Sequence, residues 1–563
     1  MIAITQRALR FVSSEVRGLH AAAYVLAACA VLSSLLALVR DRVLAHTFGA
    51  SVDLDLYYAA FRMPDLIFVV LGALVSVYML IPELSRRETI ESQRDYIDTI
   101  VAGFSVLAVT VSLIAVGIAP FVLEMIFPGF VSQGRIDELV SLTRIMLLQP
   151  VLLGLSNILA AITQVRHRYA LYALSPLLYS VGIIFGATVF LPLWGLSGLA
   201  WGVVLGAFMH MAIQVPSIAA DGFFTRIPRL VEPMALYRTA AISIPRALAL
   251  SMSQITFLGL TAFAASIASG SIAIFMFGYN LASVPLAIIG ASYSVAAFPT
   301  LARAYTRGDQ AEFLSLVATA ARYVFFWSVP IATLIVILRA HIVRVILGSG
   351  AFDWTDTRLT AAAFALFSVS LATQGLSLLL VRGYYAAGST IVPLVVAIGT
   401  SITTLLLAAF ALSSLTDHAM LGLVEEFLRV EGLSGSPVLA LAFAFSVASV
   451  LGTIALTLHF EYRFRGFLSR IVRTVLESMI AAIGAASGAY IFLVYASVLN
   501  VSSTVLSIFL QGFGAGLCGI SIGALAYFLL GSREFAETYA SIRARLWREQ
   551  EQEDVTLVAS AEQ

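Results

Sequence analysis

The sequence predicts an all-α polytopic membrane protein with about 14 transmembrane helices, arranged as two parallel-repeat six-helix lobes around a central cavity plus two extra helices. Composition is the first reason. Of 563 residues, 60% are hydrophobic and 12% are charged, whereas a soluble globular domain carries roughly 25% charged residues. The mean hydropathy is +0.96. The second reason is that the apolar residues come in long blocks, and the third is an internal repeat.

The apolar blocks match the length of membrane-spanning helices, which need about 20 residues to cross the hydrocarbon core. Before the first block, segment 1–19 has an apolar face and predicts an amphipathic helix at the membrane surface. The predicted spans then lie near residues 20–46, 55–82, 97–119, 139–164, 168–192, 196–218, 238–266, 271–301, 318–338, 359–386, 390–412, 437–460, 470–496 and 503–531.

Charge alternates between the loops that join these spans. Most arginines fall in every second loop, and the opposite loops are uncharged or acidic, apart from the loop at 339–358 with its three arginines. Loops rich in arginine stay in the cytoplasm. The alternation therefore predicts that both termini are cytoplasmic, including the polar tail 532–563.

The repeat consists of VRHRYALYALSP at 165–176 and VRGYYAAGSTIVP at 381–393. Six predicted spans separate the copies, so both have the same orientation in the membrane, as in transporters built from parallel repeats. This division gives an N-lobe at 20–235, a C-lobe at 236–460 and two further helices within 461–531. An accidental similarity of two Arg-Tyr turns is the alternative interpretation.

Besides Asp55 at the very start of the second span, five charged residues lie inside the first two predicted spans, where an arginine costs from about 3 to more than 10 kcal/mol. The two helices run antiparallel, and Pro64 is expected to loosen the second one. Because each span places its charges about 10–15 Å from the outer end, the five side chains should share one depth; they are Arg40, Asp41, Arg42, Arg62 and Asp65. Either they pair with one another and only stabilise the fold, or they line a hydrated cavity for an anion such as phosphate.

Predicted span 7 adds a cation from the second lobe. Arg246 follows Pro245 directly, about 12 Å from the predicted cytoplasmic end, and Gln254 lies two turns further on. A snorkelling arginine on a Pro-kinked helix is the alternative to a ligand-binding role. Arg382, at the end of span 10, is better explained as an interfacial anchor.

Signatures of enzymes and cofactor sites are missing from the sequence. The seven His residues and two Cys residues show no metal-ligand spacing, and no glycine-rich loop between a strand and a helix could hold a nucleotide phosphate. No catalytic activity, cofactor, metal or nucleic-acid partner is therefore predicted. A transporter of this kind would draw on an ion gradient, the membrane potential or substrate turnover.

Several motifs, in order, resemble the MurJ (MviN) family, the lipid II flippases of bacterial peptidoglycan synthesis. The longest is LVRDRVLAHTFGASVDLDLYYAAFRMPDL at 38–66. The others are FPGF at 127–130, RHRYALYALSPLLYS at 166–180, PRALALSMSQI at 245–255, AFP at 297–299 and FSVSLATQGLSLLLVRGYYAAGSTIVP at 367–393. The resemblance covers roughly the first 460 residues. It implies the fold of the multidrug/oligosaccharidyl-lipid/polysaccharide exporter superfamily, with two six-helix lobes about a V-shaped cavity.

Only some of the family's cationic residues are present at the matching positions of this sequence. Arg40 and Asp41 match its Arg-Asp pair in helix 1, and Asp55 matches the acid that opens helix 2. Three positions where the family carries arginine hold other residues here: Ser34, Phe68 and Asn280. Asn280 stays among the expected substrate-binding residues. We expect Arg42, Arg62 and Arg246 to supply replacement charge at other heights.

The resemblance implies a flippase for lipid II in the bacterial inner membrane that works by alternating access. Arg40 would anchor the anion, with Asp41 as its orienting partner. Asp55 would act as a latch at the periplasmic gate, and Arg246 would receive the head group on the cytoplasmic side. The helices at 470–496 and 503–531 would form a groove for the lipid tail.

Three alternatives remain at the sequence level: a flippase for another polyprenyl-linked glycan, an ion-coupled antiporter for organic cations, and a non-transporting scaffold that docks through segment 413–436. An antiporter for cations would need acidic cavity walls, and here cations outnumber acids in the spans. The expected partners are a polyprenyl-pyrophosphate-linked glycan and membrane lipids, with a coupling ion and cell-wall synthesis proteins as further candidates.

Overall fold

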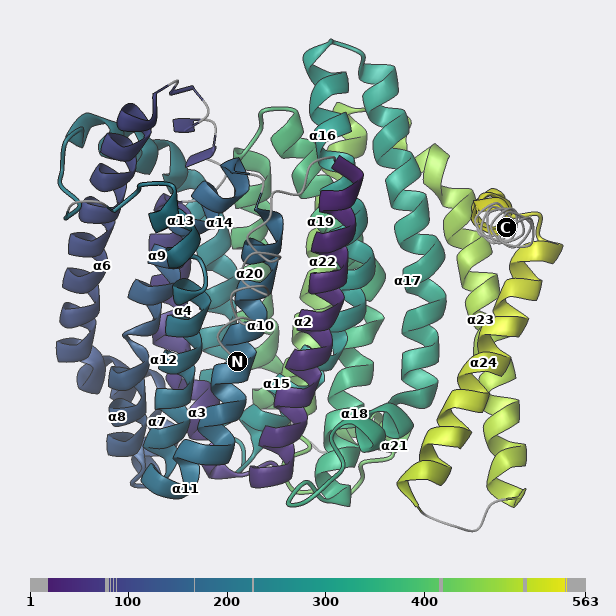
Figure 1. Ribbon diagram of the computed structural model, residues 1–563. Coiled ribbons are helices and arrows are strands. Elements are labelled where there is room, and N and C mark those ends of the chain that lie inside the picture. Colours follow the sequence, from purple (N-terminus) through teal and green to yellow (C-terminus); the bar gives the residue numbers. More distant parts are fainter. Residues whose placement is uncertain are drawn as a thin grey trace, which may run out of the picture. The chain divides into compact units, whose positions relative to one another are not determined.

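Helices account for every regular element in the part of the chain that the computed structural model describes (Figure 1). The described residues are 19–75, 80–81, 83–84, 86–87, 89–166, 168–224, 227–414, 419–499, 504–541 and 543. The surface helix predicted before residue 19 and most of the tail predicted after residue 532 lie outside them. The prediction of an all-α polytopic fold is confirmed.

The helices agree closely with the predicted spans. Within the described ranges, 12 helices are long and apolar enough to cross a membrane, and the count is 13 if one bent pair forms a single span. That pair is α18 (Trp354–Val369) and α19 (Leu371–Ala386), which meet at 45°. The remaining predicted span, 20–46, coincides with the 30-residue helix α2 (Leu19–Phe48).

The described residues form two compact units. The first contains the chain up to Leu281 together with Ile346–Ala363 and Thr390–Gly452. The helices wholly within it, besides α2, are α3 (Val52–Ala60), α4 (Arg62–Leu74), α6 (Ile90–Ile126), α7 (Pro128–Ser132), α8 (Ile136–Met146), α9 (Gln149–Val165), α10 (Tyr169–Phe185), α11 (Leu191–Trp194), α12 (Leu196–Ala212), α13 (Val215–Ala220), α14 (Pro233–Ala265), α20 (Ile391–Ser414) and α21 (Ala419–Leu428).

The second unit takes Ala282–Val345, Phe364–Ser389 and the described residues from Thr453 onward. The helices wholly within it are α16 (Ser292–Thr306), α19, α23 (Phe467–Leu499) and α24 (Val505–Leu529). Residues of both units occur in α15 (Ser271–Leu286), α17 (Gln310–Ile346), α18 and α22 (Val438–Arg463). The lobe boundaries drawn from the sequence repeat stay a prediction.

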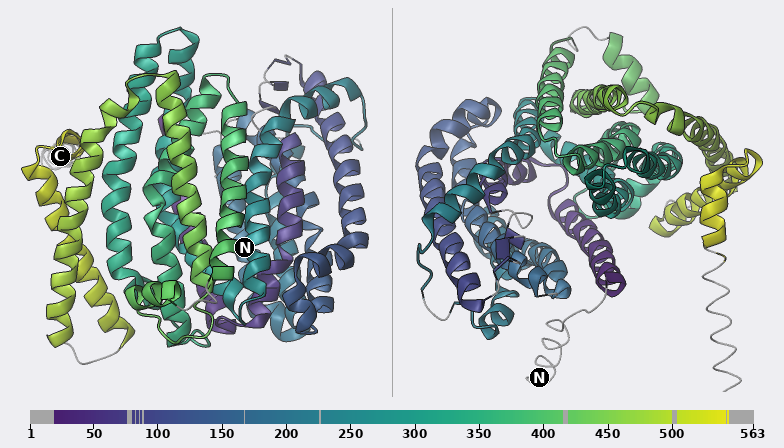
Figure 2. Two further views of the ribbon diagram at one scale, coloured as in Figure 1. Left: turned by 180° about the vertical axis from the view of Figure 1, so that it is seen from behind. Right: turned by 90° about the horizontal axis from the view of Figure 1, so that it is seen from above.

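In the second unit, α23 and α24 lie side by side, as the yellow ribbons of Figures 1 and 2 show. Small residues on these two helices pack against α17, where Ala485, Ala489 and Ala515 form a buried cluster with Leu334 and Leu338. The Tyr527 hydroxyl of α24 donates to the Phe326 carbonyl of α17 at 2.8 Å.

In the first unit, α10 and α12 pack through two facing glycine pairs. Gly182 and Gly186 come from GIIFG, and Gly202 and Gly206 come from GVVLG. A Cβ atom on Gly182 would lie 2.2 Å from the Gly206 Cα, and one on Gly186 would lie 2.5 Å from the Gly202 Cα. Such G-x-x-x-G spacing lets two membrane helices approach until their backbones touch.

We expect Gly182→Ala to lower the stability of the purified protein by about 1–3 kcal/mol, because the added methyl group overlaps backbone atoms that have no room to move. The midpoint of thermal unfolding in detergent measures this effect. Gly117→Ala is the matched control, since nothing lies within 4 Å of the Cβ position there. Equal midpoints for the two variants would contradict the close packing of α10 on α12.

Candidate functional site

The Arg40–Asp41 pair of α2 forms the centre of the candidate site. Arg40 Nε and Nη2 donate to Asp41 Oδ1 at 2.9 and 2.7 Å. Asn280 Nδ2, from α15, donates to the other carboxylate oxygen, Asp41 Oδ2, at 3.0 Å. Asp41 is 3% exposed. Its buried charge is thus compensated on both oxygens, and the Arg40 guanidinium is held in one orientation.

A break in the second span positions Arg62. The helix is interrupted at Phe61, between α3 and α4, and Pro64 lies in the first turn of α4. Proline lacks an N–H, so the backbone hydrogen-bonding of a continuous helix cannot run through this point. Arg62 Nε donates to the carbonyl oxygen of Tyr58 at 3.2 Å, which satisfies one backbone acceptor beside the break.

Arg62 is also enclosed by apolar and aromatic groups. Its guanidinium lies 5.9 Å from the centroid of the Phe257 ring and 3.7 Å from the sulfur of Met276, and the residue is 6% exposed. Asp65, one turn further along α4, accepts a hydrogen bond from Gln149 Nε2 of α9 at 3.3 Å. The second span therefore contributes its own cation and carboxylate.

These groups line one cavity of about 320 Å³, which lies entirely within the first unit. Among the described residues, its charged and amide side chains are Arg40, Arg62, Asp65, Gln149 and Asn280, its aromatic side chains are Tyr57, Tyr58, Phe61, Phe68 and Tyr179, and its other side chains are Leu44, Leu153, Ile183 and Met276. The structure thus brings together four of the residues proposed from the sequence, with Asp41 directly behind Arg40.

Two other sequence-proposed residues, Arg42 and Gln254, do not belong to this lining, and the side chain of a third, Arg246, is not described. Arg42 is exposed, and its Nη1 donates to the carbonyl oxygen of Ile346 at 2.9 Å. Gln254 is half-buried on α14 and is not one of the residues that line the cavity. Arg246 also lies on α14, but its side chain falls outside the part of the structure that is described.

The three positions where the family pattern has arginine fall in two environments. Phe68 and Asn280 line the cavity. The Ser34 hydroxyl instead donates to the Ala30 carbonyl of its own helix at 3.0 Å. Sequence reasoning missed Tyr58, Gln149 and Tyr179; the one available signal was that Gln149 is an amide inside an apolar predicted span.

Asp55 lies apart from the cavity and caps another helix. It is 2% exposed. Its Oδ2 accepts from the backbone N–H of Gly270 at 2.7 Å and its Oδ1 from that of Ala273 at 2.8 Å. These N–H groups belong to the start of α15, where a helix leaves donors unpaired and its dipole favours a negative charge. An acid of α3 therefore holds the N-terminus of α15.

Gly270 allows this close contact. Its φ is +82°, a conformation that disfavours residues with a side chain, and a Cβ there would lie 2.2 Å from the Ala50 carbonyl oxygen. The chain that precedes α15 can therefore approach the loop before α3 closely enough for Asp55 to reach both N–H groups.

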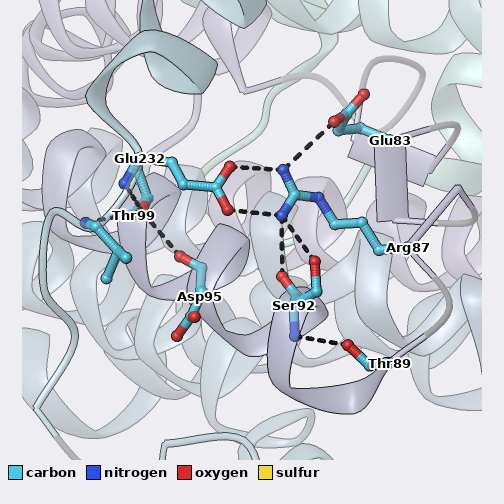
Figure 3. Close-up of polar contacts among 8 residues, drawn as sticks. Glu83, Arg87, Thr89, Ser92, Asp95, Thr99 and Glu232 are labelled. Atoms are coloured by element: carbon cyan, nitrogen blue, oxygen red, sulfur yellow. Dashed lines mark hydrogen bonds and ion pairs between the residues drawn. The ribbon is translucent and has the colours of Figure 1, made fainter.

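A second polar cluster lies away from the cavity, around Arg87 (Figure 3). Arg87 forms a bidentate pair with Glu232, with Nη1–Oε1 and Nη2–Oε2 distances of 2.8 and 2.6 Å. Its Nη1 also donates to the Ser92 carbonyl oxygen at 3.1 Å. Thr99 Oγ1 accepts from the backbone N–H groups of Val231 and Glu232 at 3.1 and 3.0 Å. The segment that leads into α14 is thus attached to the first turns of α6.

The Arg87 guanidinium holds the pKa of Glu232 below its usual range. A carboxylate with a lowered pKa contributes stability above its unfolded-state pKa, near 4.3, and loses it as the pH falls through the lower folded-state value. We expect Glu232→Gln to cost about 1 kcal/mol at pH 7, since the pair is partly exposed. Unfolding midpoints of wild type and variant, measured between pH 7 and 3, should converge at the acidic end. A difference that stays constant with pH would contradict a role for this ion pair.

Comparison with known proteins adds independent findings. A family model described as "Lipid II flippase MurJ" matches residues 44–511. A relative described as "Lipid II flippase MurJ" from Burkholderia cenocepacia is 24% identical over 403 residues, which are 70% of this chain and 78% of that protein.

Two solved structures share the fold. One, described as "Lipid II flippase MurJ, inward closed conformation", has a TM-score of 0.69 at 18% identity and covers 91% of this chain and 99% of that one. The other is an inward-facing multidrug resistance MATE family transporter of the MOP superfamily. It has a TM-score of 0.59 at 13% identity and covers 78% of this chain and 96% of that one.

Proposed function

The chain belongs to the lipid II flippase MurJ family, and from this premise we propose that it moves lipid II, a pyrophosphate-linked glycan on a polyprenyl tail, across the bacterial inner membrane. The observation that carries this proposal is the fixed Arg40 guanidinium, held by Asp41 on the wall of a cavity that also contains Arg62. Guanidinium groups bind phosphate oxygens through paired hydrogen bonds and remain charged at every physiological pH.

We assign the roles as follows. Arg40 is the anion anchor and Asp41 orients it. Asp55 is a latch on the predicted periplasmic side, because its bonds to the start of α15 must break before α3 and α15 can separate. Arg246 of α14 receives the head group on the predicted cytoplasmic side.

Transport proceeds by alternating access in this proposal. The pyrophosphate and its sugar–peptide head enter from the cytoplasmic side while the polyprenyl tail stays in lipid, and the protein then opens to the outside. Proline and glycine within the spans, as at the break beside Pro64, provide points where helices can bend. The paired helices α23 and α24 are proposed to hold the tail.

The arginine-rich loops support an orientation with both termini in the cytoplasm. A coupling ion and proteins of cell-wall synthesis are proposed as further partners, the latter at the outer segment 413–436.

A flippase for another polyprenyl-linked glycan is the second candidate. Phe68 and Asn280 favour it, because both line the cavity at positions where the family pattern supplies arginine. Two fewer guanidiniums beside the ligand would suit a head group with a different arrangement of charge.

Complementation tests the proposal. In a bacterium depleted of its own lipid II flippase, the wild-type chain is expected to restore the fraction of lipid II exposed on the outer leaflet. The empty vector provides the baseline, and immunodetection in the membrane fraction verifies insertion. If well-inserted protein restores nothing, lipid II is not the cargo, and the same assay with another polyprenyl-linked glycan becomes the test of the second candidate.

A further inference from the structure

Helix α24 ends in a glycine turn, and a short helix over residues 533–541 follows, named here the C-terminal helix. The Ser532 N–H donates to the Tyr527 carbonyl oxygen at 3.0 Å, and the Gly531 N–H donates to that of Phe528 at 3.1 Å. Gly531 has a φ of +64°. This bonding pattern with a left-handed glycine is a common way for a helix to stop, so the C-terminal helix starts as a separate element.

A buried carboxylate attaches the C-terminal helix to two membrane helices of the second unit. Glu534 is 3% exposed. Its Oε1 lies 3.0 Å from Arg322 Nε of α17 and accepts from Thr474 Oγ1 of α23 at 3.2 Å. A carboxylate so deeply buried is unfavourable without a charged partner and hydrogen bonds. One side chain of the C-terminal helix thus joins α17 to α23.

A second carboxylate, three residues further on, adds to this attachment. The Tyr323 hydroxyl of α17 donates to Glu537 Oε2 at 2.6 Å, and Arg533 Nε donates to Oε1 at 2.7 Å. Between the two acids, the Phe535 ring stacks on that of Tyr527 of α24, with 6.4 Å between the centroids. The five residues that bond the C-terminal helix to α17 and α23 are named the clasp: Arg322, Tyr323, Thr474, Glu534 and Glu537.

The face of α24 that packs on α17 and α23 carries small residues. A Cβ on Gly519 would lie 2.6 Å from Leu334 Cδ2 of α17 and 2.8 Å from the Ala485 carbonyl oxygen of α23. Small residues allow membrane helices to approach closely, but their contacts have no directional bond that resists a shift along the helix axis. Buried polar pairs are the groups that specify such a register. The clasp supplies them at the end of α24.

We propose that Glu534 is a positioning residue for transport: through the clasp it sets the position of α24 on α17, and so keeps the α23–α24 pair in the arrangement that holds a polyprenyl tail. The inference rests on the proposed function, which assigns the tail to these two helices. Glu534 acts here through the helices and not by contact with the head group. Its importance therefore depends on the length of the tail.

The test measures the binding of two lipids to the purified full-length chain in detergent. Both carry the lipid II head group, one on the full-length polyprenyl tail and the other on a tail shortened to a few isoprene units. Glu534→Met leaves Arg322 buried without its partner. This variant is expected to bind the long-tailed lipid about 4- to 15-fold more weakly, equal to the loss of apolar contact for one or two methylene groups, and the short-tailed lipid within about 2-fold of wild type.

A double variant separates positioning from a need for the charge itself. Replacing both members of a buried ion pair by apolar side chains often preserves stability. Arg322→Met combined with Glu534→Met is therefore expected to regain long-tail binding to within about 3-fold of wild type. If the double variant binds the long-tailed lipid as weakly as Glu534→Met alone, the proposal is overturned, because docking of the C-terminal helix is then not what the carboxylate provides.

Tyr323→Phe tests the clasp without leaving a buried charge unpaired, and it keeps the test decisive if Glu534→Met does not fold. It removes the hydroxyl that donates to Glu537, and a loss of about 2- to 4-fold is expected for the long-tailed lipid alone. Glu312→Met is the matched control. Glu312 also lies on α17 and pairs with Arg307 at 3.1 Å, but its side chain is 41% exposed. Binding of both lipids should stay within about 2-fold in this control.

The two ways in which the experiment can fail are distinct. If Glu534→Met and Tyr323→Phe weaken both lipids equally, or weaken neither, the clasp is refuted as a positioning device, while binding of lipid II by wild type still supports the flippase. If wild type binds neither lipid, the proposed function fails and the inference that rests on it fails as well.

Discussion

Arg40→Ala is expected to abolish the outer-leaflet exposure of lipid II in the complementation assay, whereas Arg42→Ala retains most of it. The two arginines are two residues apart on α2 and carry the same charge. Arg40 lines the cavity, and Arg42 is exposed and bonded to the Ile346 carbonyl oxygen. Loss of the Arg40 guanidinium removes the proposed phosphate contact and leaves the buried Asp41 with the Asn280 amide as its side-chain partner among the described residues. Breaking such a buried pair costs about 3–5 kcal/mol.

The measurement is the fraction of lipid II accessible from outside, with membrane content of each variant as the expression control. Arg40→Lys separates two explanations, because lysine keeps the charge but loses the planar fork. We expect Arg40→Lys to insert into the membrane like wild type and to retain only a minor part of transport. Equal transport by the Arg40 and Arg42 alanine variants would refute the anchor role.

Asp55→Leu is expected to lower the stability of the protein by about 2–4 kcal/mol, since two buried N–H groups at the start of α15 lose their acceptor. Asp55→Asn keeps one acceptor oxygen and should lose less. If Asp55 is a periplasmic latch, both variants should also increase labelling of a cysteine placed at Tyr57 by a membrane-impermeant reagent added outside.

Asp53→Asn is the control for this experiment. Asp53 lies on the same helix and also makes a charged contact, with Arg135 at 2.7 Å, but its side chain is 46% exposed. An exposed pair of this kind contributes about 0–1 kcal/mol. Unfolding midpoints that fall equally for Asp53→Asn and Asp55→Leu would contradict the assignment of Asp55 as a buried helix cap.

Helix positions were accessible from the sequence because the membrane imposes a length and a polarity on each span. The expectation that Arg40, Arg62 and Asp65 lie close together came from counting residues at a fixed rise along two antiparallel helices, and all three line one cavity. The depth of a residue along a helix does not show which way its side chain points. Successive residues of a helix point about 100° apart, so Arg40, Asp41 and Arg42 cannot share one face, and Arg42 points elsewhere.

Contacts between segments far apart in the sequence could not be predicted and were found only in the structure. Asn280 is 239 residues from Asp41 along the chain, and Gly270 is 215 residues from Asp55. No local pattern encodes these partners. Tyr58 and Gln149 carry no formal charge, so they did not stand out in their apolar spans in the way that the arginines did.

The close glycine contact of α10 with α12 has a mechanical consequence for the cavity. Tyr179, on the α10 wall, belongs to this contact, because a Cβ on Gly206 would lie 2.4 Å from its carbonyl oxygen. That wall is backed by a second helix at backbone distance. Phe61, at the break between α3 and α4, lines the same cavity. We expect the α10 side to set the shape that a ligand must match, because contacts at backbone distance leave this helix little room to shift.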